Sequence, residues 1–128
     1  MKVMIKTILT CIVSYLGYFL GGLDTMMITL LIFMLVDYVT GVCVAIKTKK
    51  VCSKIGFVGI LRKLVILLLV GACNLLGNAI NIEGLRYLAI SFYLANEGIS
   101  IIENASKLGV PVPAKLQEIL SQLKEGDK

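Results

Sequence analysis

The sequence predicts an all-α integral membrane protein with about four transmembrane helices and a short amphipathic C-terminal helix. Hydrophobic residues make up 58% of the 128 residues and charged residues only 16%, against roughly 25% charged residues in an ordinary soluble domain. The mean hydropathy is +0.92, and the hydrophobic residues fall into four blocks. Because a helical span needs about 17 to 25 apolar residues, four spans and their loops leave no room for a soluble catalytic domain.

The first two apolar blocks predict spans over residues 7–23 and 25–46. Lys2 and Lys6 precede the first block, which is long for a signal peptide and is followed by no A-x-A-like cleavage site. The second block is interrupted only by Asp37 and ends at a basic loop. The cations of this basic loop are Lys47, Lys49, Lys50 and Lys54.

The third block allows two interpretations. Residues 64–80 are almost wholly apolar, whereas residues 55–61 are apolar but punctuated by glycine, and Arg62 and Lys63 separate the two stretches. Either residues 55–61 form a separate element in the membrane interface, or one long helix begins near Ile55 and carries both cations into the membrane. The third span therefore starts at residue 55 or at residue 64.

The fourth block predicts a span over residues 87–104, the least hydrophobic of the four, which closes a transmembrane domain of residues 1–104. Residues 105–128 are expected to form a cytoplasmic linker and a tail helix that ends near Gly126. Two prolines precede the tail, and the second can open a helix at its first position. The apolar residues of the tail recur at helical spacing, at Leu116, Ile119, Leu120 and Leu123. This amphipathic helix would lie on the membrane or pack against neighbouring helices.

The distribution of Lys and Arg predicts the orientation. The N-terminus, the basic loop and the tail hold nearly all of these residues, whereas the loops at Asp24 and at residues 81–86 hold only Arg86. Because short loops rich in Lys and Arg stay in the cytoplasm, both termini are expected there. The net charge of +5 fits flanks that contact the lipid bilayer. Since no aromatic residues interleave the cations, no nucleic-acid partner is expected.

Charged residues within the apolar blocks fall at one depth. Asp37 and Glu97 each lie ten residues before a lysine, and Lys63 lies nine residues after Lys54. At about 1.5 Å per residue, all three sit roughly 14 Å inside the cytoplasmic boundary. Intramembrane charges normally face a protein partner or a water-filled path. We call Asp37, Arg62, Lys63 and Glu97 the polar seam. It either lines a pore or switches an oligomer, or it only fastens helices together while its cations snorkel to the interface.

Small and amide side chains mark candidate helix contacts. They are Ser14, Gly17 and Gly21 in the first span, Gly41 in the second, and Asn74 and Asn78 in the third. Small residues let helix backbones approach closely, and asparagine side chains can hydrogen-bond across helices. The pattern fits packing within one chain as well as contact between copies.

The sequence contains no recognisable catalytic, cofactor-binding or metal-binding motif. It has no histidine, which excludes a Ser-His-Asp or Cys-His arrangement, and it has no phosphate loop. The four cysteines form neither a CxxC pattern nor a disulfide framework. We therefore expect no enzyme activity, no cofactor and no metal.

The end of the second span and the start of the third carry an ordered set of motifs. They are Asp37-Tyr38-Val39-Thr40-Gly41, Ser53-Lys54-Ile55-Gly56 with Gly59, and Arg62-Lys63, followed by Asn96-Glu97-Gly98 to Asn104 and Lys107-Leu108-Gly109-Val110-Pro111-Val112-Pro113. Over residues 37–123 this set resembles the phage lysis and toxin-secretion holins of Gram-positive hosts, the group that includes the clostridial toxin-export holin. Cys52 departs from the pattern, which often has serine there.

The resemblance implies a holin, which forms homo-oligomers in the bacterial cytoplasmic membrane and opens lesions through which an endolysin or a toxin crosses, with host cell lysis in the phage case. It implies no catalytic residues. A small four-helix transporter or ion channel is one alternative, although the exporters of that type carry a glutamate in the first span that is missing here. A non-permeabilising antiholin is another. A second start at Met4 would remove Lys2, as in some holin genes, but an ordinary lysine flank is the simpler interpretation.

Overall fold

The computed structural model describes residues 1–125, except the side chains of Leu123 and Lys124. It is all-helical over this range, which confirms the predicted fold class. The helices are α1 (Lys2–Leu20), α2 (Thr25–Lys47), α3 (Ser53–Ala79), α4 (Leu85–Lys107) and α5 (Ala114–Glu125). Gly126, near which the sequence predicts the end of the tail helix, lies outside the described residues.

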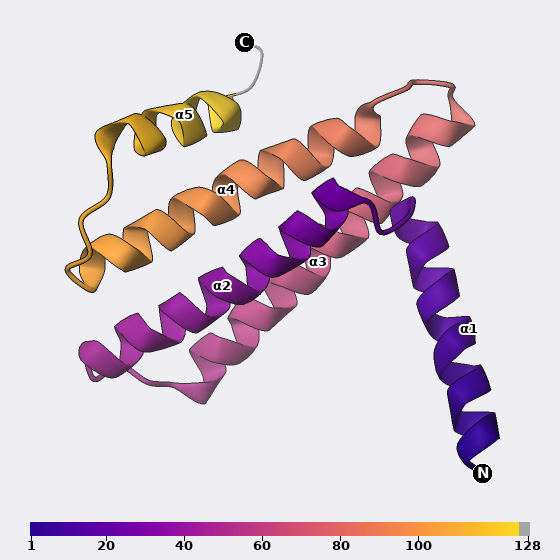
Figure 1. Cartoon of the computed structure of the whole chain (residues 1–128), viewed down its shortest axis with the longest axis horizontal. Helices are drawn as coiled ribbons and strands as arrows, with labels where there is room; N and C mark the ends of the chain where they lie inside the picture. Colours follow the sequence, from indigo (N-terminus) through magenta and orange to yellow (C-terminus); the bar gives the residue numbers. More distant parts are fainter. Residues whose placement is uncertain (126–128) are drawn as a thin grey trace.

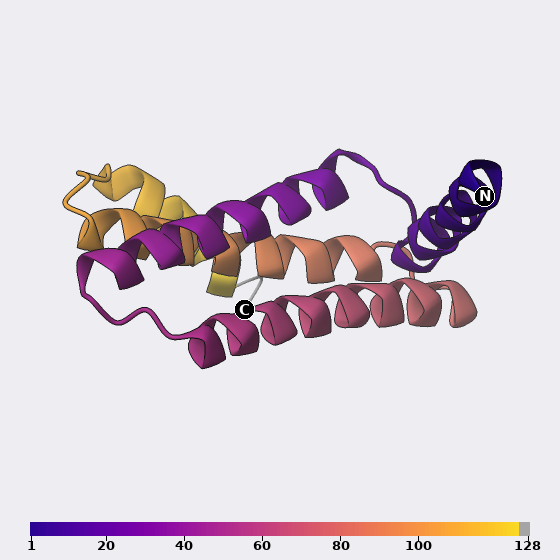
Figure 2. The same ribbon diagram turned by 90° about the horizontal axis from the view of Figure 1, so that it is seen from below.

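Helix α4 is the centre of the arrangement. Figure 1 shows α2 and α3 as an antiparallel hairpin, with α4 running back beside them and α5 folded over α4. Helix α4 packs against α2, α3 and α5, whereas α2 and α3 touch each other little. Helix α1 packs mainly against α3, and Figure 2 shows it projecting from the end of the bundle. The chain is thus a three-helix unit with an N-terminal arm and a C-terminal cover.

The turn between α1 and α2 is set by two capping devices. Gly21 adopts a left-handed conformation with φ 82°, and the N–H groups of Gly21 and Gly22 donate to the carbonyls of Tyr18 and Gly17 at 3.1 and 2.7 Å. This Schellman arrangement ends α1. Asp24 then begins α2, because its Oδ1 accepts from the Met27 N–H at 3.0 Å and so satisfies a free donor of the first turn.

The third span is one continuous helix, which decides between the two interpretations of the sequence. Helix α3 runs for 27 residues through the glycine-punctuated stretch and through Arg62 and Lys63. At about 1.5 Å per residue it is roughly 40 Å long, against about 30 Å for the hydrocarbon core of a bilayer. Helix α3 is therefore longer than a perpendicular span requires.

The buried core is small for a chain of this length. Its fully or nearly buried hydrophobic members are Leu20, Met27, Leu30, Met34, Val70 and Ile90. By contrast, residues 1–16 are all exposed, as are many apolar side chains of α2 and α3. A soluble protein rarely exposes such contiguous apolar surface, but in a bilayer the lipid covers it. The surface is that of a membrane protein.

Three helices in the described part of the chain, α1, α2 and α3, are long and apolar enough to cross a membrane. Helix α4 does not meet the same measure, so the fourth span stays a prediction. Its lower hydrophobicity has a physical reason, because α4 is covered by other helices on several sides and buries the polar side chains of Arg86 and Glu97. A helix that faces protein rather than lipid can carry more polar residues.

The tail helix α5 lies against α4. A Cβ atom placed on Gly98 would come within 3.2 Å of a Leu120 methyl group and within 3.5 Å of the Phe33 ring. The missing side chain at Gly98 therefore leaves room for Leu120 of α5 and Phe33 of α2 to approach the same point of α4. Of the two placements that the sequence left open for the tail, the structure shows packing against a neighbouring helix.

Candidate functional site

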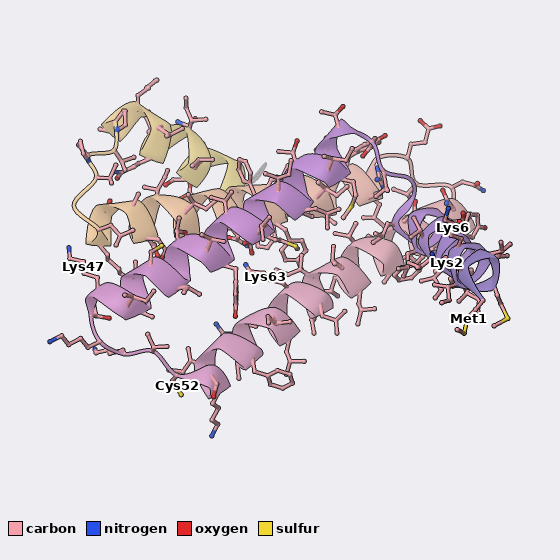
Figure 3. All side chains as sticks on the ribbon, turned by 60° about the horizontal axis from the view of Figure 1, so that its bottom comes forward. Met1, Lys2, Lys6, Lys47, Cys52 and Lys63 are labelled. Carbon is pink, nitrogen blue, oxygen red and sulfur yellow. The ribbon has the colours of Figure 1, made fainter. Side chains whose placement is uncertain are left out.

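Three charged side chains from three different helices meet inside the bundle. Lys63 Nζ of α3 donates to Asp37 Oδ2 of α2 at 2.7 Å and to Glu97 Oε2 of α4 at 2.6 Å. Their side chains are 18%, 18% and 8% exposed, respectively. Figure 3 labels Lys63 where it lies between the helices. We call Asp37, Lys63 and Glu97 the Lys63 cluster.

Asn104 extends the Lys63 cluster toward the end of α4. Its Nδ2 donates to Asp37 Oδ1 at 3.1 Å, to the Asp37 carbonyl at 3.3 Å and to Thr40 Oγ1 at 2.9 Å. Asp37 is therefore held by an ammonium and an amide, whereas Glu97 accepts only from Lys63 among the described residues. The two acids are not equivalent, and Glu97 depends more strongly on the lysine.

With both carboxylates ionised, the Lys63 cluster carries one more negative charge than positive. All buried side-chain polar atoms in the described residues have a hydrogen-bond partner, so the cluster is satisfied as long as all three members are present. Removing one partner of a buried ion pair costs about 3–5 kcal/mol, because the remaining charge stays in a poorly polar environment. The packing of α2, α3 and α4 at this point therefore depends on this charge balance.

Arg62 does not join the other members of the predicted polar seam. Its side chain is exposed and makes no ion pair within residues 1–125. Successive residues of a helix point about 100° apart, so Lys63 reaches the acids of α2 and α4 whereas Arg62, at the neighbouring position, bonds to neither of them. The structure brings together three of the four predicted residues.

The motif around Tyr38 has a direct geometric explanation. A Cβ atom on Gly56 would lie 3.2 Å from the Tyr38 hydroxyl, and one on Gly59 would lie 3.9 Å from the Tyr38 ring. Helix α3 thus offers a side-chain-free strip on which Tyr38 rests. A Cβ atom on Gly41 would lie 3.8 Å from Asn104 Nδ2. The glycines of the motif let α2 approach α3 and α4 beside the Lys63 cluster.

A groove of about 770 Å³ lies between α2 and α3 on this side of the molecule. It runs from the loop of residues 48–52 down to Asp37, Lys63 and Glu97. Arg62 and Lys50 also line it. The groove follows from the arrangement of the helices, because α2 and α3 both pack on α4 but hardly on each other.

A second charged network lies at the opposite end of α4. The Arg86 guanidinium donates to the Asp24 carboxylate twice, from Nη1 to Oδ2 at 2.8 Å and from Nη2 to Oδ1 at 3.2 Å. It also donates to two backbone carbonyls, from Nη2 to Gly22 at 2.8 Å and from Nε to Leu20 at 2.5 Å. Asn74 of α3 donates to the Phe19 carbonyl at 3.1 Å. We call Asp24, Asn74 and Arg86 the turn clamp, because they hold the turn between α1 and α2 to α3 and α4.

The turn clamp changes the chemistry of Asp24. The hydrogen bonds from the Arg86 guanidinium lower the pKa of the Asp24 carboxyl to about 2, so Asp24 is ionised at any physiological pH. In the sequence Arg86 stands out only as the single cation of its loops, and this network is not predicted from it. That isolation was the available signal, since a lone arginine between apolar spans needs a partner.

The predicted packing residues fall into two groups. Gly21 is enclosed, because a Cβ atom there would come within 2.5 Å of Arg86 and Asn74. Gly41 and Asn74 also make contacts between helices. Gly17 has nothing within 4 Å of its Cβ position, and Ser14 and Asn78 are exposed.

One close helix contact was not predicted from the sequence. A Cβ atom on Gly71 of α3 would overlap the Phe19 ring of α1. Phe19 therefore packs directly on the α3 backbone, beside the carbonyl that Asn74 holds. Nothing in the spacing of the glycines distinguished Gly71 from the others.

The basic loop lies at the end of α2, where Figure 3 labels Lys47 and Cys52. Lys47 Nζ donates to the Lys107 carbonyl at the end of α4, at 2.9 Å, and a cation there also matches the helix dipole. Lys49, Lys50 and Lys54 are exposed. The backbone N–H groups of Ile55 and Lys54 lower the pKa of the Cys52 thiol.

Catalytic or metal chemistry has little support in this geometry. Within residues 1–125, no group of three or more His, Cys, Asp or Glu side chains is placed to hold a metal ion. Cys11, Cys43, Cys52 and Cys73 are all free thiols. The Lys63 cluster is an ion-pair network between helices, and its geometry suits a role in helix association.

Comparison with known proteins agrees with this description. The bacteriophage holin family matches residues 14–125. An uncharacterised 14.9 kDa protein from the nagH 3′ region of Clostridium perfringens is 44% identical over 80% of this chain and 80% of its own length. An uncharacterised protein of Clostridium acetobutylicum is 35% identical over 94% of this chain and 98% of its own.

A further relative comes from outside the clostridia. The uncharacterised protein YtkC of Bacillus subtilis is 34% identical over 88% of this chain and 84% of its own length. No solved structure matches this chain. The family match covers α2 to α5 and the end of α1, and thus includes every residue of the Lys63 cluster and of the turn clamp. The chain therefore belongs to the bacteriophage holin family and is a holin-like membrane protein.

Proposed function

We propose that this protein oligomerises in the bacterial cytoplasmic membrane and permeabilises it, so that an endolysin or a toxin can cross. The observation that carries the proposal is the Lys63 cluster, an ion-pair network between three helices. The outer faces of these helices are apolar and suit lipid. Charges at such a depth are costly and are normally tied to a functional path or partner. Family membership supports the same conclusion.

The proposed mechanism is a balance between two environments for the same charges. In the closed state Lys63 balances one of the two negative charges of Asp37 and Glu97 between packed helices. In an open assembly the same side chains line a water-filled lesion, where their desolvation cost disappears. The free-energy difference between these states sets how many copies must accumulate before the membrane opens.

The loose packing of α2 on α3 supplies the movement. Both helices are held mainly through α4, and the groove between them already reaches the Lys63 cluster. Separating α2 from α3 breaks the Lys63–Asp37 bond and opens this groove to its full depth. A second copy can then occupy the gap without breaking the packing of either helix on α4.

Inducible expression in a bacterium tests the proposal. Culture density and membrane potential are followed with and without a co-expressed cytosolic endolysin. Abrupt depolarisation, with lysis only when the endolysin is present, is the expected result. A steady culture with normal membrane potential would contradict it and would favour a non-permeabilising antiholin, whereas a saturable proton-driven flux in liposomes would favour a transporter.

The proposed orientation has its own test. If both termini are cytoplasmic, Cys52 in the basic loop faces the cytoplasm. A variant that keeps only Cys52 should react with a membrane-impermeant maleimide in inside-out vesicles but not in intact cells. Labelling in intact cells before any depolarisation would contradict this orientation and would place the basic loop outside the cytoplasm. The lowered pKa of this thiol favours fast labelling at neutral pH.

A further inference from the structure

The groove between α2 and α3 has the composition of a lipid site. Its walls are mostly apolar and include Val42, Ile55 and Ile60. Lys50 lies at its mouth, in the loop that joins the two helices, and Arg62 lies deeper along α3. A groove with apolar walls, one cation at its mouth and a second cation farther along matches a molecule with an acyl chain and an anionic head.

The two cations are free to bind such an anion. Both acids that line the groove, Asp37 and Glu97, are bound by Lys63. Within residues 1–125, neither Lys50 nor Arg62 makes an ion pair. The lining has three basic and two acidic side chains, so its net charge is 3 − 2 = +1. The groove therefore attracts an anion, and neither of its own carboxylates is paired with Arg62.

The position of Arg62 along α3 also favours an anionic partner. Arg62 lies nine residues after the first residue of α3, which places its backbone about 14 Å below the helix start. Side chains of a helix lean toward its N-terminus, and the N-terminus of α3 is the end at which the groove opens. The guanidinium therefore extends toward the headgroup region, where a phosphate can accept two hydrogen bonds from it.

We propose that this groove binds one anionic phospholipid, with its phosphate at Arg62, its headgroup near Lys50 and an acyl chain along Val42 and Ile60. The bilayer is the natural source, because the groove opens on faces of α2 and α3 that are exposed and apolar. The lipid fills the space between two helices that hardly touch. It thereby supports the closed Lys63 cluster at the base of the same groove.

The absence of tryptophan from the sequence allows a direct test. A single tryptophan is introduced by Val42→Trp, the protein is reconstituted in vesicles, and its fluorescence is quenched by brominated phosphatidylglycerol or by brominated phosphatidylcholine. We expect a binding preference of about fivefold for the anionic lipid per engaged cation. Arg62→Gln in the same background should reduce this preference by about fivefold.

Matched controls separate the groove from the general surface. Lys54→Gln removes a cation that lies in the same segment but does not line the groove, and it should leave the preference unchanged. Leu35→Trp places the reporter on an exposed position of α2 outside the groove, where the two lipids should quench equally. If Val42→Trp does not fold, Ile55→Trp provides a second reporter that lines the groove.

Three outcomes would overturn the proposal. Equal quenching by both lipids at position 42 would show that the groove has no preference for an anion. Weak quenching by both lipids would show that another copy of the chain covers the groove. Loss of the preference on addition of inorganic phosphate to phosphatidylcholine-rich vesicles would identify a free phosphate, and not a lipid, as the ligand of Arg62.

Discussion

The Lys63 cluster and the turn clamp both join helices by pairing acids with a base, but they do so in different ways. In the Lys63 cluster the ammonium donates to carboxylates, and all three members project from the middle parts of their helices. In the turn clamp, Arg86 binds one carboxylate and two backbone carbonyls at helix ends. The first network is sensitive to side-chain charge, and the second is a cap for the backbone.

This difference assigns them different roles. The carbonyls that Arg86 satisfies need a donor in any state of the protein, so the turn clamp is expected to persist when the membrane opens. The Lys63 cluster has an excess negative charge and a single central base, so it can exchange its ion pairs for water. We therefore expect mutations in the Lys63 cluster to change timing, and mutations in the turn clamp to change stability and accumulation.

The largest expected effect comes from Lys63→Met. It leaves two carboxylates without a cation inside the bundle, which should destabilise the closed state by about 3–5 kcal/mol. Depolarisation should occur earlier after induction, measured with a potential-sensitive dye at equal amounts of protein in the membrane. Lys54→Met, at an exposed lysine of the same helix, serves as the control.

A triple variant makes this prediction specific for charge. Asp37→Asn and Glu97→Gln combined with Lys63→Met remove all charges of the Lys63 cluster together, so no charge remains without a partner. Depolarisation should return toward the wild-type time. If the triple variant were as early as Lys63→Met alone, loss of packing and not charge imbalance would explain both.

Arg86→Gln should have the next largest effect. Losing the guanidinium leaves the Leu20 and Gly22 carbonyls without a donor, at a cost of about 2–3 kcal/mol. We expect a lower midpoint of thermal unfolding in detergent and less protein in the membrane, but unchanged depolarisation time once the membrane amounts are matched. A shifted depolarisation time at matched amounts would show that the turn clamp also takes part in opening.

A pair of glycine variants tests the contact of α1 with α3 beside the turn clamp. Gly71→Ala places a methyl group against the Phe19 ring and should cost about 1–2 kcal/mol through overpacking. Gly17→Ala meets nothing within 4 Å and should be neutral or slightly stabilising, since alanine favours helix. Thermal unfolding of the two variants in detergent compares them directly. Equal destabilisation would mean that Gly17 contacts another copy of the chain.

The smallest expected effect concerns the pH dependence of the turn clamp. The pKa of Asp24 falls from 3.8 to about 2 on folding, so its stabilising contribution is complete above about pH 4 and is lost as the pH falls through about 2. The difference in unfolding midpoint between the wild type and Asp24→Asn should therefore be constant above about pH 4 and shrink below it. A difference that changed near neutral pH would exclude this assignment.

Much of the fold follows from the sequence, because the lengths of the hydrophobic blocks predict the helices. Counting residues from the span ends predicts one depth for Asp37, Lys63 and Glu97, and the structure shows their side chains in contact. The same counting includes Arg62, because it gives depth along a helix but not direction around it. Direction depends on which neighbours pack on α3, and this is a property of the tertiary structure.

The same limit explains what the sequence analysis missed. Arg86 reaches residues more than 60 positions away in the chain, and no local pattern reveals that partner. Gly71 and Gly17 look alike in sequence, yet only Gly71 lies under a ring of another helix. The amphipathic pattern of the tail predicted α5 but not the helix on which it packs.

The most direct test of the account is the time from induction to loss of membrane potential in a charge series at the Lys63 cluster. Glu97→Gln removes the excess negative charge, so it should stabilise the closed state and delay depolarisation, whereas Lys63→Met should advance it. At equal membrane content, the account predicts the order Lys63→Met, wild type, Glu97→Gln. Identical times for all three would contradict the claim that these charges set the balance between closed and open states.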